Sequence, residues 1–361
     1  MLNLRKSELD TPFIAADLDT VKGNIARMQK LVDSHDKKLR PHSKTHKIPS
    51  VALWQIEAGA VGVCVQKTSE AEVMVRGGVG DVFVSNEVIG SQKTDRLAML
   101  AEGAKISVAV DSVLGVEQLS RSAKSRGVEV GVYLDVDVGM RRCGVLAEHA
   151  ADLAEVVTKS PNLNFVGIMG YDGHSWKPVD NEERRRIVEA SRNVLRHAVR
   201  EVRARGIGFD VISVGGTAST PVWVEYDDIT ELQAGAYVYN DVMQMERGVP
   251  KANCAVTLTG TVMSKPFNDQ AVVDAGSKSF AFDHGRYPVP VQDVNGEVVG
   301  FSEEHTVLRS KQGPIAVGLG DRIEFFPYHI CTLIDLWDRI NFCRKDEVVS
   351  TATIDGRGAR T

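Results

Sequence analysis

The chain lacks a long apolar run, and its cysteines are few. No stretch approaches the ~18 uninterrupted apolar residues of a membrane-spanning helix, and the opening MLNLRKSELDTPF lacks the apolar core of a signal peptide. The odd number of scattered cysteines makes a disulfide framework improbable. They are Cys64, Cys143, Cys254, Cys331 and Cys343. We therefore expect a cytoplasmic protein with no membrane partner.

The chain also lacks a basic stripe. Its formal net charge is −5, and it has no cluster of positive charge that would attract nucleic acid or an anionic membrane surface. A content of 43% hydrophobic and 25% charged residues is ordinary for a soluble globular enzyme. Because single cores stop growing near roughly 250–300 residues, 361 residues indicate a large domain with a smaller partner domain.

Short apolar runs alternate with segments of helical periodicity along the first two thirds of the chain. Such alternation predicts a parallel sheet, and eight repeats favour a closed (β/α)8 barrel of the TIM type, an α/β fold. The expected strands lie near residues 38–44, 62–66, 81–86, 106–111, 131–137, 164–171, 209–216 and 231–239.

The pattern changes near Glu246, where strand-like runs follow one another with little helix between them. The runs are CAVTLTGTVM, AVVDAG, PIAVGL, RIEFF and EVVSTATI. We expect a barrel over residues 20–245 and a β-rich domain formed by residues 1–19 and 246–361. The first run, Phe13-Ile14-Ala15-Ala16, could pair with this second domain.

The carboxyl ends of barrel strands form the active sites of such folds, and here they carry polar groups. Lys44 is the informative one, because a lysine inside the strand near 38–44 would place a desolvated amine among barrel groups. A lysine that extends from a strand end into solvent explains the same pattern. The other residues at strand ends are Gln66, Asn86, Asp111, Arg142, Tyr171, Gly215, Gly216, Thr217 and Gly235.

Two glycine-rich turns accompany the last two expected strands, Gly215-Gly216-Thr217 and Gly235-Ala236-Tyr237. Barrels commonly bind phosphate at this position through backbone N–H groups, although ordinary turn chemistry accounts for the glycines equally well. A lysine on the first strand together with phosphate turns on the last two suggests pyridoxal 5′-phosphate (PLP) held by a Schiff base.

The strings RPHSKTHK (40–47), VDVGMRRCGV (136–145), GGTAST (215–220), ELQAGAYVYND (231–241) and HIC (329–331) resemble the family of D-threonine aldolases and eukaryotic-type D-serine dehydratases. That family has the alanine-racemase-like barrel of PLP fold type III. The resemblance implies an internal aldimine at Lys44 and a hydrogen bond from Arg142 to the cofactor's phenolic O3′. It also implies a cofactor shell of Gln66, Tyr171, Gly216, Thr217, Gly235, Ala236 and Tyr237.

At the position where alanine racemases place an arginine against the pyridine nitrogen, this chain has Gln233. A neutral amide there would suppress electron withdrawal by the ring less than a full cation does. A hydrogen bond at the barrel end is an alternative role for Gln233.

His329 and Cys331 stand two residues apart, so in extended backbone both side chains would point to one face. An imidazole and a thiolate suit Zn²⁺, with Mn²⁺ less natural for sulfur, and two ligands leave positions for water and a substrate oxygen. A His and a Cys in a β-domain are otherwise a core pair, but the resemblance favours a metal site. His174, after the sixth strand, is a candidate proton carrier.

These features predict a PLP- and divalent-metal-dependent lyase on D-3-hydroxy amino acids, with retro-aldol cleavage to glycine and an aldehyde. The alternative outcome is a D-serine or D-threo-3-hydroxyaspartate dehydratase that forms a 2-oxo acid and ammonia. An amino-acid racemase, a non-catalytic PLP-binding protein and a sugar-phosphate barrel enzyme fit less well. We expect a small-molecule substrate and a homodimer.

Overall fold

The computed structural model describes residues 4–361, which form two compact units. The first unit contains residues 25–44, 49–235 and 359–361, and the second contains residues 4–24, 45–48 and 236–358. Within residues 4–361, no helix combines the length and apolarity that a bilayer crossing needs. The predicted domain limits at 20 and 245 stay a prediction.

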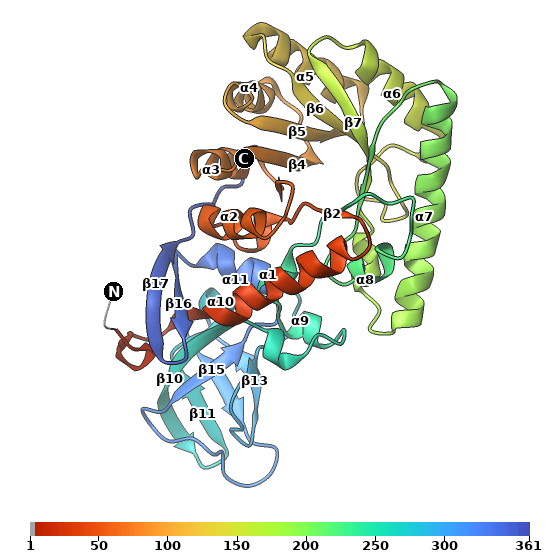
Figure 1. The fold of residues 1–361 in the computed structure, drawn as a ribbon. Helices are drawn as coiled ribbons and strands as arrows, with labels where there is room; N and C mark the ends of the chain where they lie inside the picture. Colours follow the sequence, from red (N-terminus) through yellow and green to blue (C-terminus); the bar gives the residue numbers. More distant parts are fainter. Residues whose placement is uncertain (1–3) are drawn as a thin grey trace. The chain divides into compact units, whose positions relative to one another are not determined.

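The first unit is an eight-stranded parallel sheet with helices along its outer side, as strands β4 to β7 and helices α3 to α7 show in Figure 1. Its strands, in chain order, are β2 (Lys38–Leu39), β3 (Val63–Val65), β4 (Asp81–Glu87), β5 (Lys105–Val110), β6 (Val130–Asp135), β7 (Leu163–Gly170), β8 (Val211–Val214) and β9 (Glu231–Leu232). Its helices are α2 (Pro49–Glu57), α3 (Thr68–Arg76), α4 (Ser91–Leu100), α5 (Val113–Arg126), α6 (Ala150–Lys159), α7 (Asn181–Ala204) and α8 (Thr220–Trp223), while α1 (Leu18–Asp33) crosses the division between the units. The eight predicted strands are thus confirmed.

The sheet closes between its two end strands, β2 and β3. A parallel bridge joins His42 to Cys64, and the Cys64 N–H donates to the Pro41 carbonyl at 2.8 Å. Inside the closed sheet, Phe83 stacks on Tyr133 with ring centroids 4.1 Å apart. These buried rings fill the barrel interior, so the predicted (β/α)8 barrel has a packed core and not a pore.

The second unit is mostly strand. A long path of paired strands runs β13-β14-β11-β10-β1-β16-β17, and β15 pairs with both β10 and β12. The strands are β1 (Phe13–Asp17), β10 (Val256–Phe267), β11 (Gln270–Val273), β12 (Val289–Pro290), β13 (Glu297–Phe301), β14 (Thr306–Arg309), β15 (Arg322–Phe326), β16 (Arg339–Arg344) and β17 (Glu347–Thr353) (Figure 1). Strand β1 lies between β10 and β16, so the first run does pair with the C-terminal strands, as predicted.

Short helices connect the strands of the second unit. They are α9 (Val242–Met245), α10 (Ser277–Phe280) and α11 (Ile330–Leu336). One predicted strand is wrong, because PIAVGL (314–319) forms no strand. Its N–H groups bond two different segments, with Ile315 donating to Asn268 and Ala316 to Val294, so no continuous ladder forms.

Two further corrections concern strand ends. Lys44 lies in a 3-10 turn, η2 (Ser43–Thr45), and not inside a strand. Pro41 has no N–H for a ladder, and the Lys44 N–H donates to His42 Nδ1 at 3.3 Å, so the chain leaves the sheet here. The eighth strand is only Glu231–Leu232, and residues 236–238 turn into η5.

Candidate functional site

One cavity at the barrel collects half of the residues predicted to bind a cofactor. It lies at the ends of β2, β3, β4, β6, β7, β8 and β9. Its lining residues are His42, Lys44, Gln66, Ser85, Arg142, Met169, Tyr171, Gly215 and Gln233. The cavity thus brings together residues named from the sequence, namely Lys44, Gln66, Arg142, Tyr171, Gly215 and Gln233, whose roles stay a prediction. His42, Ser85 and Met169 were not singled out from the sequence.

The cavity has two cationic side chains near one aromatic ring. Lys44 Nζ is 5.8 Å and Arg142 Cζ is 5.2 Å from the centroid of the Tyr171 ring. A cation within about 6 Å of a ring centroid is attracted by the ring quadrupole. Tyr171 therefore holds an amine and a guanidinium close together at a place suited to an anionic, planar ligand.

His42 organises the polar groups beside Lys44. Its Nδ1 accepts the Lys44 N–H, so the proton of a neutral ring lies on Nε2, which is 3.1 Å from Gln66 Oε1 and 3.3 Å from Ser85 Oγ. The Gln66 N–H donates to Glu70 Oε2 at 2.7 Å, which fixes the backbone after β3. The side-chain carbonyl and the backbone N–H of Gln66 thus each have a partner.

The turn after β8 is open at Gly216. Gly215 has φ +89°, a left-handed conformation that favours glycine, and a Cβ on Gly216 would meet only Tyr171, at 3.7 Å. The Gly216 N–H donates to Ser219 Oγ at 3.1 Å, and Thr217 lies in the turn. This backbone could approach a phosphate without side-chain obstruction.

The remaining predicted phosphate residues are divided between the units. Gly235 belongs to the barrel unit, whereas Ala236 and Tyr237 belong to the second unit as part of η5 (Ala236–Val238). Tyr237 is buried there, and the Asn240 N–H donates to the Ala236 carbonyl at 2.7 Å. Their role toward a phosphate stays a prediction.

A second hollow beside Arg142 contains acidic groups that the sequence did not reveal. It is lined by Asp135, Val136, Asp137, Met140, Arg142, Cys143 and Tyr171. Burial raises the pKa of Asp135 well above its ordinary range, and a hydrogen bond to Glu87 adds to this rise. Glu87 ends β4 and Asp135 ends β6, and only the folded sheet brings these two carboxyls together. No local sequence signal could therefore have identified them.

His174 lies in the short helix η4 (Gly173–Trp176) and is not among the residues that line the cavity within the described chain. A Cβ on Gly139 would be 3.6 Å from His174 Nε2, and among residues 4–361 its buried Nδ1 has no hydrogen-bond partner. Its proposed role as a proton carrier stays a prediction.

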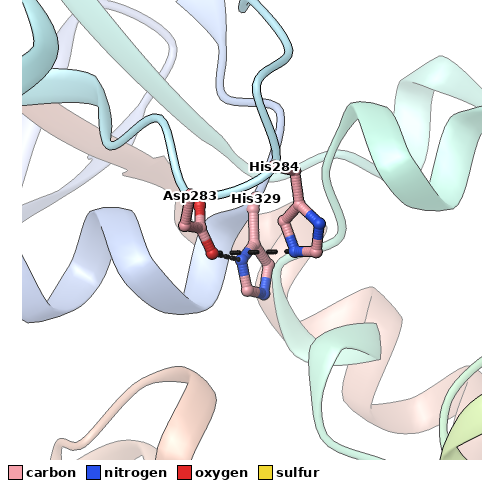
Figure 2. A group of neighbouring side chains, drawn as sticks. All are labelled: Asp283, His284 and His329. Carbon is pink, nitrogen blue, oxygen red and sulfur yellow. Dashed lines mark hydrogen bonds and ion pairs between the residues drawn. The ribbon is translucent and has the colours of Figure 1, made fainter.

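In the second unit, Asp283, His284 and His329 form a cluster of possible metal ligands (Figure 2). One ligand atom from each lies within 4.8 Å of the others. His329 Nδ1 is 2.7 Å from Asp283 Oδ2, and the His284 and His329 rings are 4.8 Å apart. Two imidazoles and a carboxylate are donors that Zn²⁺ and Mn²⁺ accept.

The electrostatics of this cluster tie the Asp283 carboxylate to the His329 imidazole. Burial acts to lower the pKa of His329, but hydrogen bonds to Asp283 and Cys331 outweigh it and raise the pKa to about 10. Burial acts to raise the pKa of Asp283, but the hydrogen bond to His329 outweighs it and lowers the pKa to about 2. The carboxylate is therefore ionised at neutral pH.

The extended HxC geometry predicted from the sequence is wrong. His329 is extended, but it caps α11, and Cys331 lies in the first turn of that helix. The Ile330 N–H donates to Asp241 Oδ2 at 2.9 Å, which anchors the helix start. Cys331 Sγ is 3.3 Å from Thr45 Oγ1 and does not belong to the three-residue cluster within the described chain.

Asp283 and His284 were not expected from the sequence. The adjacent acid and imidazole in FDHGR were a weak signal, but nothing local relates them to His329, 46 residues away. The folding of the second unit alone brings them together.

Comparison with known proteins gives strong matches over the whole chain. Residues 16–242 match the family described as "Alanine racemase, N-terminal domain", and residues 255–343 match a serine dehydratase domain. A D-threonine aldolase of Arthrobacter sp is 35% identical over 363 residues, which cover 98% of this chain and 94% of that protein.

Solved structures agree with this match. The crystal structure of D-threonine aldolase from Filomicrobium marinum has a TM-score of 0.95 and 31% identity, and the match covers 100% of this chain and 99% of that one. D-threo-3-hydroxyaspartate dehydratase from Delftia sp. HT23 has a TM-score of 0.89 and 26% identity, over 97% and 98% of the two chains. Variants of a D-threo-3-hydroxyaspartate dehydratase replace a histidine, or a cysteine two positions later, by alanine, and the cysteine variant is described as a metal-free form.

Proposed function

The chain belongs to the family of D-threonine aldolases and D-serine dehydratases, built on the alanine racemase N-terminal barrel, and on that premise we propose that it is a PLP- and metal-dependent lyase that cleaves D-3-hydroxy amino acids to glycine and an aldehyde. The observation that carries the proposal is the barrel cavity in which Lys44, Arg142, Tyr171 and Gln233 meet. An amine, a guanidinium, an aromatic ring and an open glycine turn form a donor set that fits PLP.

The residues that would hold the cofactor have different roles. The Lys44 amine would bind it covalently, and Arg142 would donate to its phenolic oxygen. Gly216, Thr217, Gly235 and Ala236 would bind the phosphate through backbone groups, with Gln66, Tyr171, Gln233 and Tyr237 around the ring. When bound, PLP supplies an electron sink for negative charge at the substrate Cα.

The protein residues prepare this cavity electrostatically. Arg142 supplies a permanent positive charge, and Tyr171 keeps it next to Lys44. His42 holds its proton on Nε2 and accepts the Lys44 N–H with Nδ1, so the backbone that carries the lysine has a fixed conformation. His174 would act as a proton carrier.

We infer that the metal ion binds in the second unit. His329 and Cys331 are the ligands predicted from the sequence, and Asp283 and His284 join His329 in space. The spacing of His329 and Cys331 equals that of the two residues replaced in the dehydratase variants, one of which is metal-free. A divalent ion, Zn²⁺ or Mn²⁺, would act as a Lewis acid on the substrate 3-hydroxyl.

The same parts could expel hydroxide in place of cleaving Cα–Cβ. The HxC element favours this second candidate, a dehydratase of D-serine or D-threo-3-hydroxyaspartate, because a dehydratase relative has the same spacing. The D-threonine aldolase matches, at 35% and 31% identity over nearly the whole chain, favour the aldolase.

One product assay separates the candidates. Purified protein with PLP and Mn²⁺ or Zn²⁺ receives D-threonine, D-phenylserine, D-serine or D-3-hydroxyaspartate, and L-threonine is the stereochemical control. Glycine with an aldehyde supports the aldolase, and a 2-oxo acid with ammonia supports the dehydratase. Formation of the L-enantiomer alone would support a racemase, and no turnover with any of them would refute the lyase.

Borohydride reduction followed by peptide mapping tests the lysine. We expect the label on Lys44. Lys47 is the internal control, because its Nζ is paired with Asp335 Oδ1 at 2.5 Å. A label on Lys47 would contradict the assignment.

We propose a homodimer as the assembled state. Ile89, Val113 and Leu114 are exposed apolar side chains near the ends of β4 and β5, and such groups often mark interfaces. Sedimentation of the purified protein measures its mass, and a monomer at micromolar concentration would refute the dimer.

A further inference from the structure

A chain of hydrogen-bonded polar side chains runs through the barrel and ends at the cofactor cavity. Its links are Arg40 NH1 to Asp81 Oδ1 at 2.6 Å, Arg40 Nε to Glu231 Oε2 at 2.9 Å, Ser213 Oγ to Glu231 Oε1 at 2.7 Å and Gln233 Nε2 to Ser213 Oγ at 2.9 Å. Arg40, Glu231, Ser213 and Gln233 are all buried. Only Gln233 lines the cavity.

The donors and acceptors along this chain have one consistent direction. Arg40 only donates and the Glu231 carboxylate, paired with Arg40, accepts, so the single hydroxyl proton of Ser213 goes to Glu231. Ser213 Oγ can then only accept from Gln233. The amide nitrogen of Gln233 is therefore the group turned toward Ser213, and this orientation follows from chemistry as well as from the coordinates.

The position of the Gln233 carbonyl oxygen follows from this orientation. The amide is planar, with Oε1 and Nε2 on opposite arms, so Oε1 is turned away from Ser213. Among residues 4–361, the only side-chain hydrogen bond of Gln233 is the one to Ser213, Oε1 is not among the buried side-chain atoms that lack a partner, and Gln233 lines the cavity. The cavity thus receives from Gln233 a hydrogen-bond acceptor.

We propose that Ser213 and Glu231 are positioning residues that hold Gln233 with its carbonyl oxygen toward the cavity, so that this oxygen accepts a proton borne by the cofactor's ring nitrogen. This inference rests on the proposed function. An arginine at this position could only donate, and it would favour an unprotonated nitrogen. A protonated pyridine ring withdraws electrons more strongly, which suits a lyase that must stabilise charge at Cα.

The nitrogen resonance of PLP labelled with ¹⁵N in the ring tests this directly, because the chemical shift distinguishes protonated from unprotonated pyridine. The holoenzyme should show the protonated shift over the whole pH range in which it is folded. Ser213→Ala releases the Gln233 amide, and its resonance should move toward the unprotonated shift as the pH rises. Ser107→Ala, a buried serine on β5, is the matched control and should behave as the parent protein does.

Gln233→Glu and Gln233→Met complete the test if Ser213→Ala does not fold. The glutamate only accepts, so it should keep the protonated shift, and the methionine lacks the acceptor and should lose it. Ser213→Ala should also lower kcat at least tenfold with little change in KM. An unprotonated ring nitrogen in a parent protein that binds PLP and turns over substrate would overturn this inference and leave the lyase intact. Failure to bind PLP at all would instead overturn the proposed function.

Discussion

The imidazole Nδ1 of His329 lies 2.7 Å from the carboxylate Oδ2 of Asp283 (Figure 2). Thr332 Oγ1 donates to the same oxygen at 2.8 Å. Asp283 therefore orients the imidazole of His329 whether or not it binds the ion itself. A carboxylate that orients a metal-binding histidine fixes the ring nitrogen that faces the metal.

Replacing Asp283 by Asn should weaken metal binding. Loss of a carboxylate that orients a histidine ligand typically costs about 10–100-fold in metal affinity, and loss of a direct ligand costs at least as much. Calorimetric titration of the metal-stripped protein with Zn²⁺ measures the affinity. Asp269→Asn, at an exposed turn of the same unit, is the control and should bind as the parent does. Equal affinities in both variants would remove Asp283 from the site.

Cys331 and Cys343, both in the second unit, should respond differently to substitution. Cys331→Ala should reduce bound metal, because it removes a thiolate predicted as a ligand. Cys343→Ala should leave the metal content unchanged, since Cys343 is buried in an apolar cluster with Phe13 and Val348. Metal analysis after dialysis decides between them. If the two variants retain the same metal content, Cys331 is not a ligand.

Arg40→Met should destabilise the barrel strongly. It leaves the buried Glu231 without its cation, although Asp81 keeps Lys105, and breaking a buried ion pair by removing one partner costs about 3–5 kcal/mol. Urea unfolding gives the change in the free energy of unfolding. Arg126→Met removes an exposed pair with Glu102 and should cost no more than about 1 kcal/mol. Similar losses in the two variants would show that the Arg40 network carries no special stability.

Alkylation of Cys143 should depend steeply on pH. Burial and a hydrogen bond to Glu87 raise the pKa of the Cys143 thiol to about 11. The thiolate is the nucleophile, so the alkylation rate should be low at neutral pH and rise about tenfold per pH unit up to the pKa. Mass spectrometry of iodoacetamide-treated peptides follows this rate. A plateau below pH 9 would contradict the raised pKa.

Much of this molecule could be predicted from its sequence because the signals are local. A buried parallel strand is a short apolar run between helical segments, and all eight barrel strands were found in this way. The strand ends then placed Lys44, Gln66, Arg142 and Tyr171 at one face, because parallel strands share an edge. Eight repeats of one pattern therefore determined both the barrel and the greater part of its cavity.

Tertiary structure decided the features that depend on partners distant in the sequence. Lys44 lies outside the strand because its N–H donates to His42 Nδ1. His329 caps a helix because the N–H of the next residue donates to Asp241. Asp283 reached His329, and Ser213 turned the amide of Gln233, only through folding. Periodicity records which side of an element is buried, but it does not record which donor meets which acceptor. The sequence alone therefore determined the barrel and its strand ends, whereas the orientation of each polar group was decided by contacts that only the folded chain makes.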